Sequence, residues 1–253
     1  RRAEHLCYLA ATTFGAAFRA AARLLGRAFC EGVFRECLLE LEVESTSLTV
    51  IVVCRHSADE RLAEVDFDWL LVVGAFFLGT FPSALLIGRI VGHNPTREGS
   101  GNPGATNMFR IAGLKAGGAT LVIDVAKALI AAWLGQWLGG TTLAAACGAA
   151  AVIGHIFPPV RSSRGGKGVA CFGGMTIGAW PILAPIALVV WIGSAKLSGH
   201  SFIGAMTGTP TVAIGTMVMG RPIAEVLIAW GITVLIVARH HTNIRAFFAA
   251  RAD

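Results

Sequence analysis

Charged residues are scarce in this sequence. They make up 14% of its 253 residues, against about 25% in an ordinary soluble domain. The six cysteines are too few for a disulfide scaffold, and the 31 glycines follow no triplet period of the collagen kind. Apolar residues account for 55% and gather in long runs. These features exclude a soluble globule, a collagen-like chain and a disordered chain, and they indicate an integral membrane protein.

Acidic residues are especially few in the second part of the chain. Residues 67–253 contain five Asp or Glu and 13 Lys or Arg, whereas residues 1–66 contain ten and eight. The net charge of +6 therefore divides into −2 and +8. No pair of carboxylates in the second part is available to hold Mg²⁺, which argues against a metal-dependent membrane phosphotransferase. The sequence therefore predicts a site without metal or cofactor.

The change in composition predicts two parts, an N-terminal extension at 1–66 and a membrane domain at 67–253. Within the extension, Ala10–Phe29 is predicted to form an amphipathic helix with arginines along one face. Such a helix fits a membrane-surface anchor or a targeting segment. The alternative is that the extension is non-native sequence and that translation starts at Val65.

The membrane domain contains six long apolar segments, and pairs of small residues within them predict close helix contacts at Gly135/Gly139, Gly174/Gly178 and Gly204/Gly208. The segments are Trp69–Val91, Ala116–Trp137, Thr141–Phe157, Val169–Ala195, Phe202–Met219 and Pro222–Ala238.

Charge decides whether Val169–Ala195 forms one span or two. Two helices, separated near Pro181, give seven spans and leave only Arg221 on one side. The other side then collects Arg89, Arg97, Arg110, Lys115, Arg161, Arg164, Lys167, Lys196, Arg239, Arg245 and Arg251. Because cytoplasmic loops are enriched in Lys and Arg, we predict an all-α integral membrane protein of seven transmembrane helices. Its N-terminus lies outside, its C-terminus is cytoplasmic, and its active site is on the cytoplasmic face, where the longer loops lie.

The loop between the first two spans is rich in hydrogen-bond donors. It reads Gly99-Ser100-Gly101-Asn102-Pro103-Gly104-Ala105-Thr106-Asn107-Met108-Phe109-Arg110. Glycines let backbone N–H groups approach a ligand closely, and the Arg110 guanidinium suits phosphate. The glycine spacing also fits a dinucleotide fingerprint, but that motif needs a βαβ unit, whereas this loop joins two membrane spans. We therefore predict phosphate binding here, with Ser100, Asn102, Gly104, Thr106, Asn107 and Arg110 as candidates.

Two further inner segments carry cations. In the loop 161–168, Gly165 and Gly166 precede Lys167, which favours anion binding, although Lys167 lacks the Ser or Thr that would follow it in a Walker loop. The tail 239–245 carries His240 and Asn243. For both segments the alternative is a basic cluster that contacts lipid headgroups.

Ionisable residues also lie inside the predicted spans. His155 is a candidate base or ligand-binding donor, with a packing role as the alternative. Asp124 and Lys127 are spaced i, i+3 and can pair on one helix face. We interpret them as a structural pair, although ionisable residues inside a membrane are functional by default.

Several motifs, in order along the chain, resemble the bacterial membrane glycerol-3-phosphate acyltransferases that use acyl-phosphate donors (PlsY-type). The segment Gly99–Arg110 resembles the first motif of that family. Gly154-His155-Ile156-Phe157-Pro158 followed by Gly165-Gly166-Lys167-Gly168-Val169-Ala170 resembles the second, and Arg239-His240 with Asn243-Ile244 resembles the third. The resemblance runs from about Trp69 to Arg245 and leaves residues 1–66 uncovered.

The resemblance implies a reaction and a location. The 1-hydroxyl of glycerol 3-phosphate would attack the carbonyl of an acyl-phosphate, giving lysophosphatidic acid and phosphate, the first acylation of phospholipid synthesis. The protein would lie in the bacterial cytoplasmic (inner) membrane, with membrane lipid around it and no nucleic acid as partner. The enzyme that forms the acyl-phosphate is a candidate protein partner.

The resemblance also assigns residues. It implies phosphate binding at Ser100, Arg110, Lys167, Ser201, His240 and Asn243, with Asn102, Thr106, Asn107 and His155 supporting the pocket. We predict Ser100, Arg110, Lys167 and His155 as the catalytic set, and Asn102, Gly104, Thr106, Asn107, Gly165, Gly166, Ser201, His240 and Asn243 as the substrate-binding set. Around Ser201 the chain departs from the family, since Gly199-His200-Ser201-Phe202 stands where an aromatic-Val-Ser-Leu pattern is usual.

A membrane transporter for phosphate or phosphorylated solutes is the alternative function. It would also explain cationic loops in a membrane bundle, but it predicts polar groups near the bilayer midplane and often an internal repeat. The sequence shows no repeat, and its donors gather at one face. For the enzyme, two candidates for the catalytic base stay open, a phosphate group of the substrate and His155.

Overall fold

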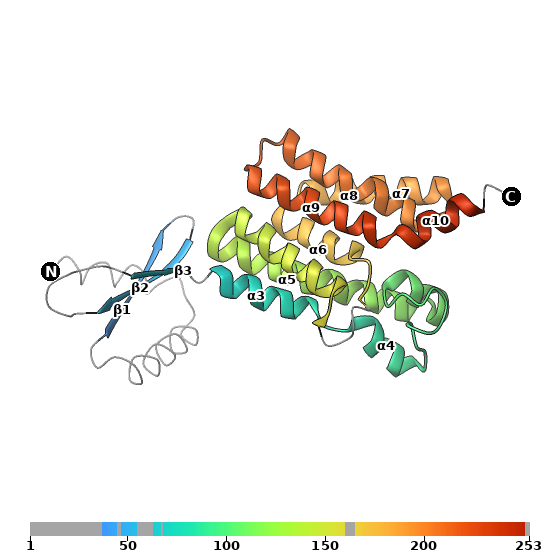
Figure 1. Cartoon of the computed structure of the whole chain (residues 1–253), viewed down its shortest axis with the longest axis horizontal. Coiled ribbons are helices and arrows are strands. Elements are labelled where there is room, and N and C mark those ends of the chain that lie inside the picture. The colour runs from blue at the N-terminus through green and yellow to red at the C-terminus, as the bar shows by residue number, and fades with distance from the viewer. Residues whose placement is uncertain (1–36, 45–46, 55–62, 67, 160–164, 251–253) are drawn as a thin grey trace. The chain divides into compact units, whose positions relative to one another are not determined.

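The structure is a computed structural model that describes residues 37–44, 47–54, 63–66, 68–159 and 165–250 (Figure 1). The predicted helix Ala10–Phe29 and the cations Arg161 and Arg164 lie outside the described residues. The strands before residue 67 belong to one compact unit and the helices from Asp68 onward to another.

The first unit contains a three-stranded sheet in the order β1 (Cys37–Glu44), β2 (Ser47–Cys54), β3 (Ala63–Asp66). Strands β2 and β3 pair antiparallel, with Val50 opposite Val65. The sequence of β1, CLLELEVE, alternates apolar and acidic residues from Leu39 onward, which is the period-two pattern of a strand. Our all-α prediction therefore does not hold for this region, because alternating apolar and acidic residues favour strands.

In the second unit, the regular elements that the structure describes from Asp68 onward are all helices. Its first predicted span is broken in the middle, into α3 (Asp68–Gly79) and α4 (Ser83–Val91). Pro82 precedes α4 and has no backbone N–H to continue the hydrogen-bond ladder of α3. Because of the break, the Phe81 carbonyl is outside the helical hydrogen-bond pattern. It accepts a hydrogen bond from Lys127 Nζ at 3.1 Å.

Helix α5 (Ala105–Ile156) consists of three helical stretches. The backbone leaves helical geometry at Gly113, where φ is 79°, and at Gly139 and Gly140, where φ of Gly140 is 76°. At the second break the chain turns back on itself. The close contact between the two sides shows this, since a Cβ added at Gly135 would lie 2.7 Å from the Leu143 carbonyl. The second and third stretches therefore form a helical hairpin over the predicted spans Ala116–Trp137 and Thr141–Phe157.

The segment Val169–Ala195 forms two helices, as charge predicts. They are α6 (Val169–Ala179) and α7 (Leu183–Ser198). Helix α8 (Ser201–Val218), helix α9 (Ile223–Arg239) and the short α10 (His241–Ala249) complete the unit.

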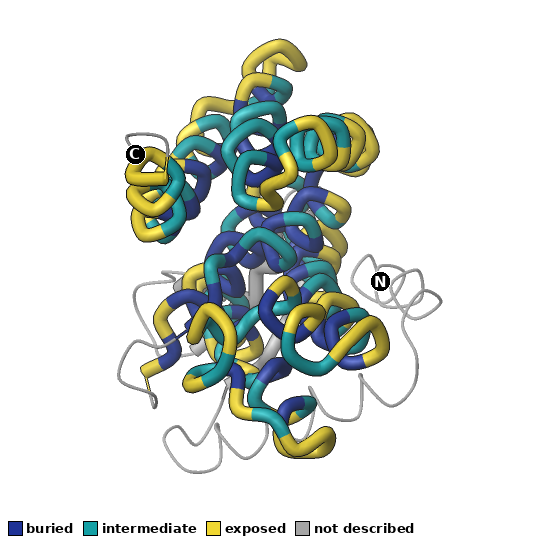
Figure 2. Tube along the Cα trace, turned by 90° about the vertical axis from the view of Figure 1, so that its right-hand side faces the viewer, coloured by how far each residue is buried: buried dark blue, intermediate teal, exposed yellow. Residues whose placement is uncertain are grey.

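Glycines allow the helices of this unit to approach closely, as the small-residue pairs predict. A Cβ at Gly174 of α6 would collide with the Val125 carbonyl of α5, and one at Gly204 of α8 would lie 2.7 Å from the Trp191 carbonyl of α7. Buried residues are mostly small, with Ala the commonest among them. Figure 2 shows the buried residues where helices face one another and the exposed ones on the outward sides.

A buried polar cluster closes one end of the bundle. The Glu225 side chain is 1% exposed and accepts hydrogen bonds from Thr142 Oγ1 (2.9 Å), Trp180 Nε1 (2.8 Å) and Arg221 Nε (2.8 Å). These residues come from the turn after Gly140, the end of α6 and the start of α9. Because α6 begins at Val169 and ends beside this cluster, the loop 165–168 lies at the opposite end of the bundle.

Among the described residues, two helical stretches are long and apolar enough to cross a membrane, Asp68–Val91 and Ala105–Ile156, and a third if α9 and α10 form one bent span. Large apolar side chains are exposed around the bundle, among them Ile90, Val189 and Val218 at 70% or more. A soluble monomer rarely exposes so much apolar surface, whereas lipid covers it at no cost.

Candidate active site

Asn107 holds the first loop in shape. Its side chain is buried, and its Oδ1 accepts the Ser100 backbone N–H at 2.9 Å. Its Nδ2 donates to the carbonyls of Pro95 and Glu98, each at 3.0 Å. The Arg110 guanidinium also reaches Asn107 Oδ1, at 3.4 Å. The Asn107 side-chain amide thus hydrogen-bonds with the loop backbone and with Arg110. Asn107 therefore positions the Ser100 N–H and the Arg110 guanidinium.

Two glycines give this loop its tight course. Gly99 and Gly101 have φ of 61° and 69°, the left-handed region that favours glycine. At Gly99 a side chain would also collide with Asn107 Oδ1. The loop ends at Gly104, after which a helical stretch begins at Ala105. The N–H groups of Ala105 and Thr106 are in the first turn, where they lack helical acceptors and suit an anion.

The second loop meets the tail through cations. Lys167 Nζ donates to Asn243 Oδ1, and Arg239 donates to the Gly165 carbonyl at 3.2 Å. The Arg239 guanidinium also lies over the Phe157 ring, 5.7 Å from its centroid. Within the described part of the chain, Arg239 Nε is buried and has no hydrogen-bond partner. This N–H is therefore an unsatisfied donor beside the second loop.

Like charges converge at this place. The pKa of Lys167 lies below its ordinary value because the ammonium is partly buried and because Arg239 and Arg110 repel its charge. Burial likewise lowers the pKa of His240, whose Nδ1 lies 2.8 Å from the Ile236 carbonyl, and Lys167 and Arg239 lower it further. The first loop, the second loop and the tail thus bring their cations to one site, which favours a ligand of high negative charge.

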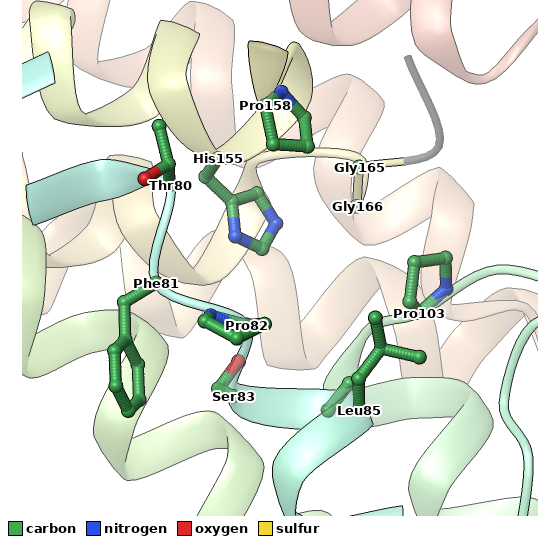
Figure 3. Close-up of a pocket in the computed structure, with 11 residues that line it drawn as sticks. Thr80, Phe81, Pro82, Ser83, Leu85, Pro103, His155, Pro158, Gly165 and Gly166 are labelled. Atoms are coloured by element: carbon green, nitrogen blue, oxygen red, sulfur yellow. The ribbon is translucent and has the colours of Figure 1, made fainter. Parts of the chain in front are cut away.

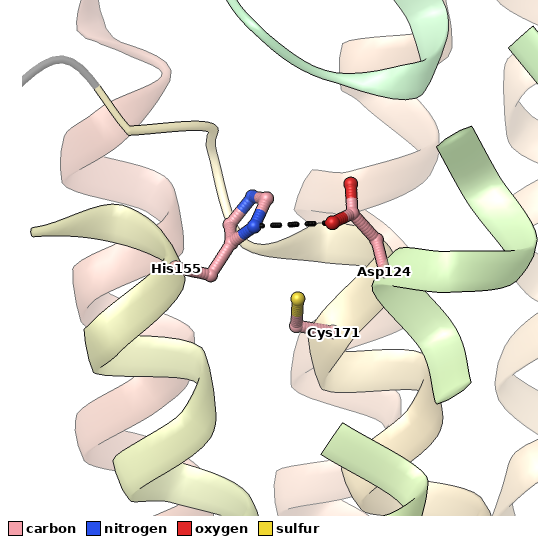
Figure 4. Close-up of side chains that lie close together, drawn as sticks. All are labelled: Asp124, His155 and Cys171. Carbon is pink, nitrogen blue, oxygen red and sulfur yellow. Dashed lines mark ion pairs between the residues drawn. The ribbon is translucent and has the colours of Figure 1, made fainter. Parts of the chain in front are cut away.

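A buried network lies beneath these loops, at the break between α3 and α4. Asp124 Oδ1 accepts a hydrogen bond from Ser83 Oγ at 2.6 Å and pairs with Lys127 Nζ at 3.0 Å. His155 Nδ1 lies 2.8 Å from the same Nζ and 3.4 Å from Asp124 Oδ1 (Figure 4). The pair that we predicted as structural is therefore joined to a predicted site residue.

Asp124, His155 and the thiol of Cys171 each offer a ligand atom within 4.8 Å of the others, a spacing that could suit a metal ion. Figure 4 shows the three side chains converging. The Lys127 ammonium, however, already contacts Asp124 and His155. A metal ion would compete with this cation for the same oxygen and nitrogen, so the donor set fits an ammonium rather than a metal.

A small pocket connects the network to the loops. It is lined by Thr80, Phe81, Pro82, Ser83, Ala84, Leu85, Pro103, His155, Pro158, Gly165 and Gly166 (Figure 3). Pro103 comes from the first loop and the two glycines from the second. A Cβ on Gly165 would collide with the carbonyls of His155 and Ile156, and one on Gly166 with His155 Nε2. The glycine pair therefore allows the second loop to lie directly against His155.

A family model described as glycerol-3-phosphate acyltransferase matches residues 69–250. The chain belongs to this family. A glycerol-3-phosphate acyltransferase of Pseudomonas paraeruginosa (strain DSM 24068 / PA7) is 42% identical over 185 residues, 72% of this chain and 97% of the relative. Another, of Pseudomonas fluorescens (strain Pf0-1), is 39% identical over the same shares.

Two solved structures are similar in fold. Both are of PlsY, an integral membrane glycerol 3-phosphate acyltransferase, one in its glycerol 3-phosphate form (TM-score 0.70) and one in its lysophosphatidic acid form (TM-score 0.68). Each is 30% identical and covers 73% of this chain and 93% of its own. Together with the apolar helices, the likeness identifies this acyltransferase-family chain as a membrane protein.

The structure brings most of the predicted site residues of this acyltransferase-family chain to one end. Lys167 and Asn243 are in contact, Arg110 is close enough to affect the pKa of Lys167, and His155, Gly165 and Gly166 share the pocket. Gly104 and Thr106 begin the helix after the first loop, Asn102 is half-buried in that loop, and Ser100 is exposed.

Ser201 is the predicted site residue that the structure connects least directly to the other site residues. It is exposed and begins α8. Its neighbour His200 packs against Phe202 and against Phe247 of α10. Ser201 is thereby placed near the helix that carries Asn243.

Sequence reasoning did not include Arg239, Ser83 and Lys127 among the site residues. For Arg239 a signal existed, because it stands beside His240 in the third motif.

Proposed function

We propose that this protein transfers an acyl group from an acyl-phosphate to the 1-hydroxyl of glycerol 3-phosphate, releasing lysophosphatidic acid and phosphate. The observation that carries the proposal is the convergence of Arg110, Lys167 and Arg239, from three segments of the chain, at one end of a membrane bundle. Both proposed substrates are phosphate anions, and so is the leaving group. Membership of the acyltransferase family supports this function over the transporter alternative.

The cations and donors would act on charge as it develops. When the hydroxyl oxygen attacks the acyl carbonyl, the bond between the carbonyl carbon and the phosphate oxygen breaks, and negative charge grows on the leaving phosphate. Lys167 and Arg239 would stabilise that charge, which is the largest single contribution in many enzymes. Ser100, Arg110 and the N–H groups after Gly104 would hold the second phosphate, and His240, Asn243 and Ser201 would complete the binding set. Holding both substrates together adds the advantage of proximity.

The pocket beside His155 would hold the reacting groups. Asn102 and Thr106 would complete its first-loop wall, which Asn107 shapes, and Gly165 and Gly166 let the second loop close against the histidine. The hydroxyl proton must be accepted during attack, and a phosphate oxygen of the substrate is one acceptor, with His155 Nε2 as the other. No metal or cofactor takes part in this scheme.

The proposal extends to topology and location. Seven helices would span the bacterial inner membrane, with residues 67–253 forming the acyltransferase domain and the C-terminus in the cytoplasm. The pocket and the cationic loops would then face the cytoplasm, and the enzyme that forms the acyl-phosphate would be a partner on that side. The family likeness and the exposed apolar surface support membrane insertion.

The test is phosphate release by the purified full chain in lipid nanodiscs from palmitoyl-phosphate plus glycerol 3-phosphate, with palmitoyl-CoA as a parallel donor. We expect release that depends on glycerol 3-phosphate and no turnover of the CoA ester. Lys167→Met should lower kcat/KM by about 100-fold or more, since one transition-state donor is commonly worth that much. Lys196→Met, which removes an exposed cation at the end of α7, is the control. Turnover of the CoA ester alone would refute the proposed donor.

A further inference from the structure

Lys127 is a buried ammonium with three acceptors. Its side chain is 3% exposed, and Nζ lies 3.1 Å from the Phe81 carbonyl, 3.0 Å from Asp124 Oδ1 and 2.8 Å from His155 Nδ1. A lysine ammonium carries three N–H donors and no acceptor. The Cys171 thiol is a further hydrogen-bonding neighbour of Lys127. A buried charge of this kind is stable only when it is paired and hydrogen-bonded in this way.

This arrangement fixes where the proton of His155 sits. If Nδ1 carried hydrogen, that N–H would point at the N–H groups of the ammonium at 2.8 Å, and an ammonium has no lone pair to accept it. The alternative acceptor for an Nδ1–H, Asp124 Oδ1, is farther away, at 3.4 Å, and already receives Ser83 and Lys127. Nδ1 is therefore the acceptor, and the single proton of a neutral imidazole is on Nε2.

The Nε2 edge of the ring is turned toward the pocket. It faces Gly166, where a Cβ would collide with Nε2, and the pocket here is bounded by Pro103 of the first loop and Gly165 of the second (Figure 3). An Nε2–H in this position can donate to an anionic or carbonyl oxygen in the pocket. It cannot take a proton from the attacking hydroxyl, because the nitrogen that would accept it already holds one.

We propose that Lys127 is a positioning residue that holds His155 in the Nε2–H tautomer, so that His155 serves the reaction as a hydrogen-bond donor and not as the general base. Asp124 and Ser83 anchor Lys127, and the break at Pro82 supplies the Phe81 carbonyl. The inference rests on the proposed function for the role in catalysis, but not for the tautomer. It implies that the hydroxyl proton goes to a phosphate oxygen of the acyl-phosphate, whose phosphate leaves as hydrogen phosphate when its bond to the carbonyl carbon breaks.

The tautomer is tested by ¹⁵N NMR on the full chain, labelled at histidine and held in nanodiscs at neutral pH. The chain has seven histidines, and the signal absent from His155→Gln identifies His155. We expect an unprotonated Nδ1 and a protonated Nε2. A protonated Nδ1, alone or together with Nε2, would overturn the proposal. This measurement needs no substrate, so it stands even if acyl transfer is not observed.

The catalytic role is tested by two substitutions of His155. Gln can place an amide N–H near the position of Nε2 but cannot act as a base, whereas Ala supplies neither function. We expect His155→Gln to keep kcat within about tenfold of the parent and His155→Ala to lose about 100-fold, the common cost of one transition-state donor. An equal collapse of both variants would favour the base and refute the donor role.

Lys127→Met provides the positioning readout. It removes the donor to Nδ1 with little change in side-chain length, so the ring is free to place its proton on Nδ1 toward Asp124. We expect the His155 signals to change to that tautomer and kcat to fall. Unchanged His155 signals in a folded Lys127→Met protein would show that Lys127 does not set the tautomer. If this variant does not fold, the NMR spectrum of the parent protein decides.

Discussion

At the scale of single residues, the second loop shows how a missing side chain can matter as much as one that is present. Gly165 and Gly166 were predicted to cradle an anion through their N–H groups. The structure gives them a further role, because both Cα atoms press against the end of α5 at His155. A methyl group at either position would displace what it touches.

Gly166→Ala should therefore impair catalysis more than folding. The added Cβ would push against His155 Nε2, the far end of a side chain, and would displace the ring from its position beside Lys127. We expect kcat/KM to fall by about 100-fold, comparable to the loss of one transition-state donor. Melting in detergent should change little. Gly231→Ala, where a Cβ meets nothing within 4 Å, is the matched control, and equal activities of the two variants would contradict the expected collision.

The lowered pKa of Lys167 predicts an effect of pH on activity. If the charged ammonium holds phosphate, activity falls as pH rises through this lowered pKa. Arg239→Gln removes one of the charges that repel the ammonium, so the pKa of Lys167 should rise and the alkaline limb of kcat/KM should move to higher pH. The pH–rate profile measures this directly. Lys196→Gln should leave the limb in place, and a shift to lower pH in Arg239→Gln would have the wrong sign.

The same residues show what a sequence can and cannot reveal. The i, i+3 spacing of Asp124 and Lys127 predicts their pairing, and the structure confirms it at 3.0 Å. Their third partner, His155, lies 28 residues beyond Lys127, and no periodicity links positions that far apart. Asn107 was predicted to line the pocket, but whether its amide faces a ligand or the loop depends on the fold of the loop, which only coordinates show.

At the scale of the helices, glycines set how closely the elements approach. Hydropathy located the apolar segments, and charge divided Val169–Ala195 correctly into α6 and α7. Hydropathy did not locate the break at Pro82, because the segments on both sides of it, α3 and α4, are apolar. The strands of the first unit were not predicted either. The many charged residues there lower the mean hydropathy, although apolar and acidic residues alternate along β1.

Gly174→Ala should destabilise the bundle. Its Cβ would meet the Val125 carbonyl and lie 2.9 Å from the Leu129 backbone nitrogen, and backbone atoms in a packed helix cannot move aside cheaply. Overpacking of this kind typically costs 1–3 kcal/mol, so the melting temperature in nanodiscs should fall by several degrees, since about 1 kcal/mol shifts it by roughly 2–4 °C at this size.

Gly173→Ala is the control for Gly174→Ala. It changes the adjacent residue of the same helix at a position where a Cβ meets nothing within 4 Å. Alanine is the better helix former, so this variant should be as stable as the parent or slightly more so. If both variants melted alike, the close approach of α6 to α5 would be wrong.

At the scale of the whole molecule, the two ends of the helical bundle differ in chemistry. One end brings together Arg110 of α5, Lys167 of the second loop and Arg239 at the end of α9. At the other, short turns meet at Glu225, whose charge is compensated within the bundle by Arg221. An excess of cations at one end orients a membrane protein with that end in the cytoplasm.

This polarity predicts which residues react from which side of the membrane. In a chain whose four N-terminal cysteines are replaced by serine, the described cysteines Cys147 and Cys171 are buried and should give little background. Met219→Cys, at the Glu225 end, should react with a membrane-impermeant maleimide in intact right-side-out vesicles. Lys196→Cys, at the cationic end, should react only after the vesicles are opened.

Both cysteines lie at exposed positions next to helix ends, so a difference in labelling would reflect the side of the membrane and not burial. Labelling of both from outside would refute the predicted orientation, and labelling of Lys196→Cys alone would reverse it. Labelling of Met219→Cys alone would place α8 across the membrane, although its 18 residues are at the lower limit for a span. The cationic loops would then have direct access to soluble glycerol 3-phosphate, as the proposed reaction requires.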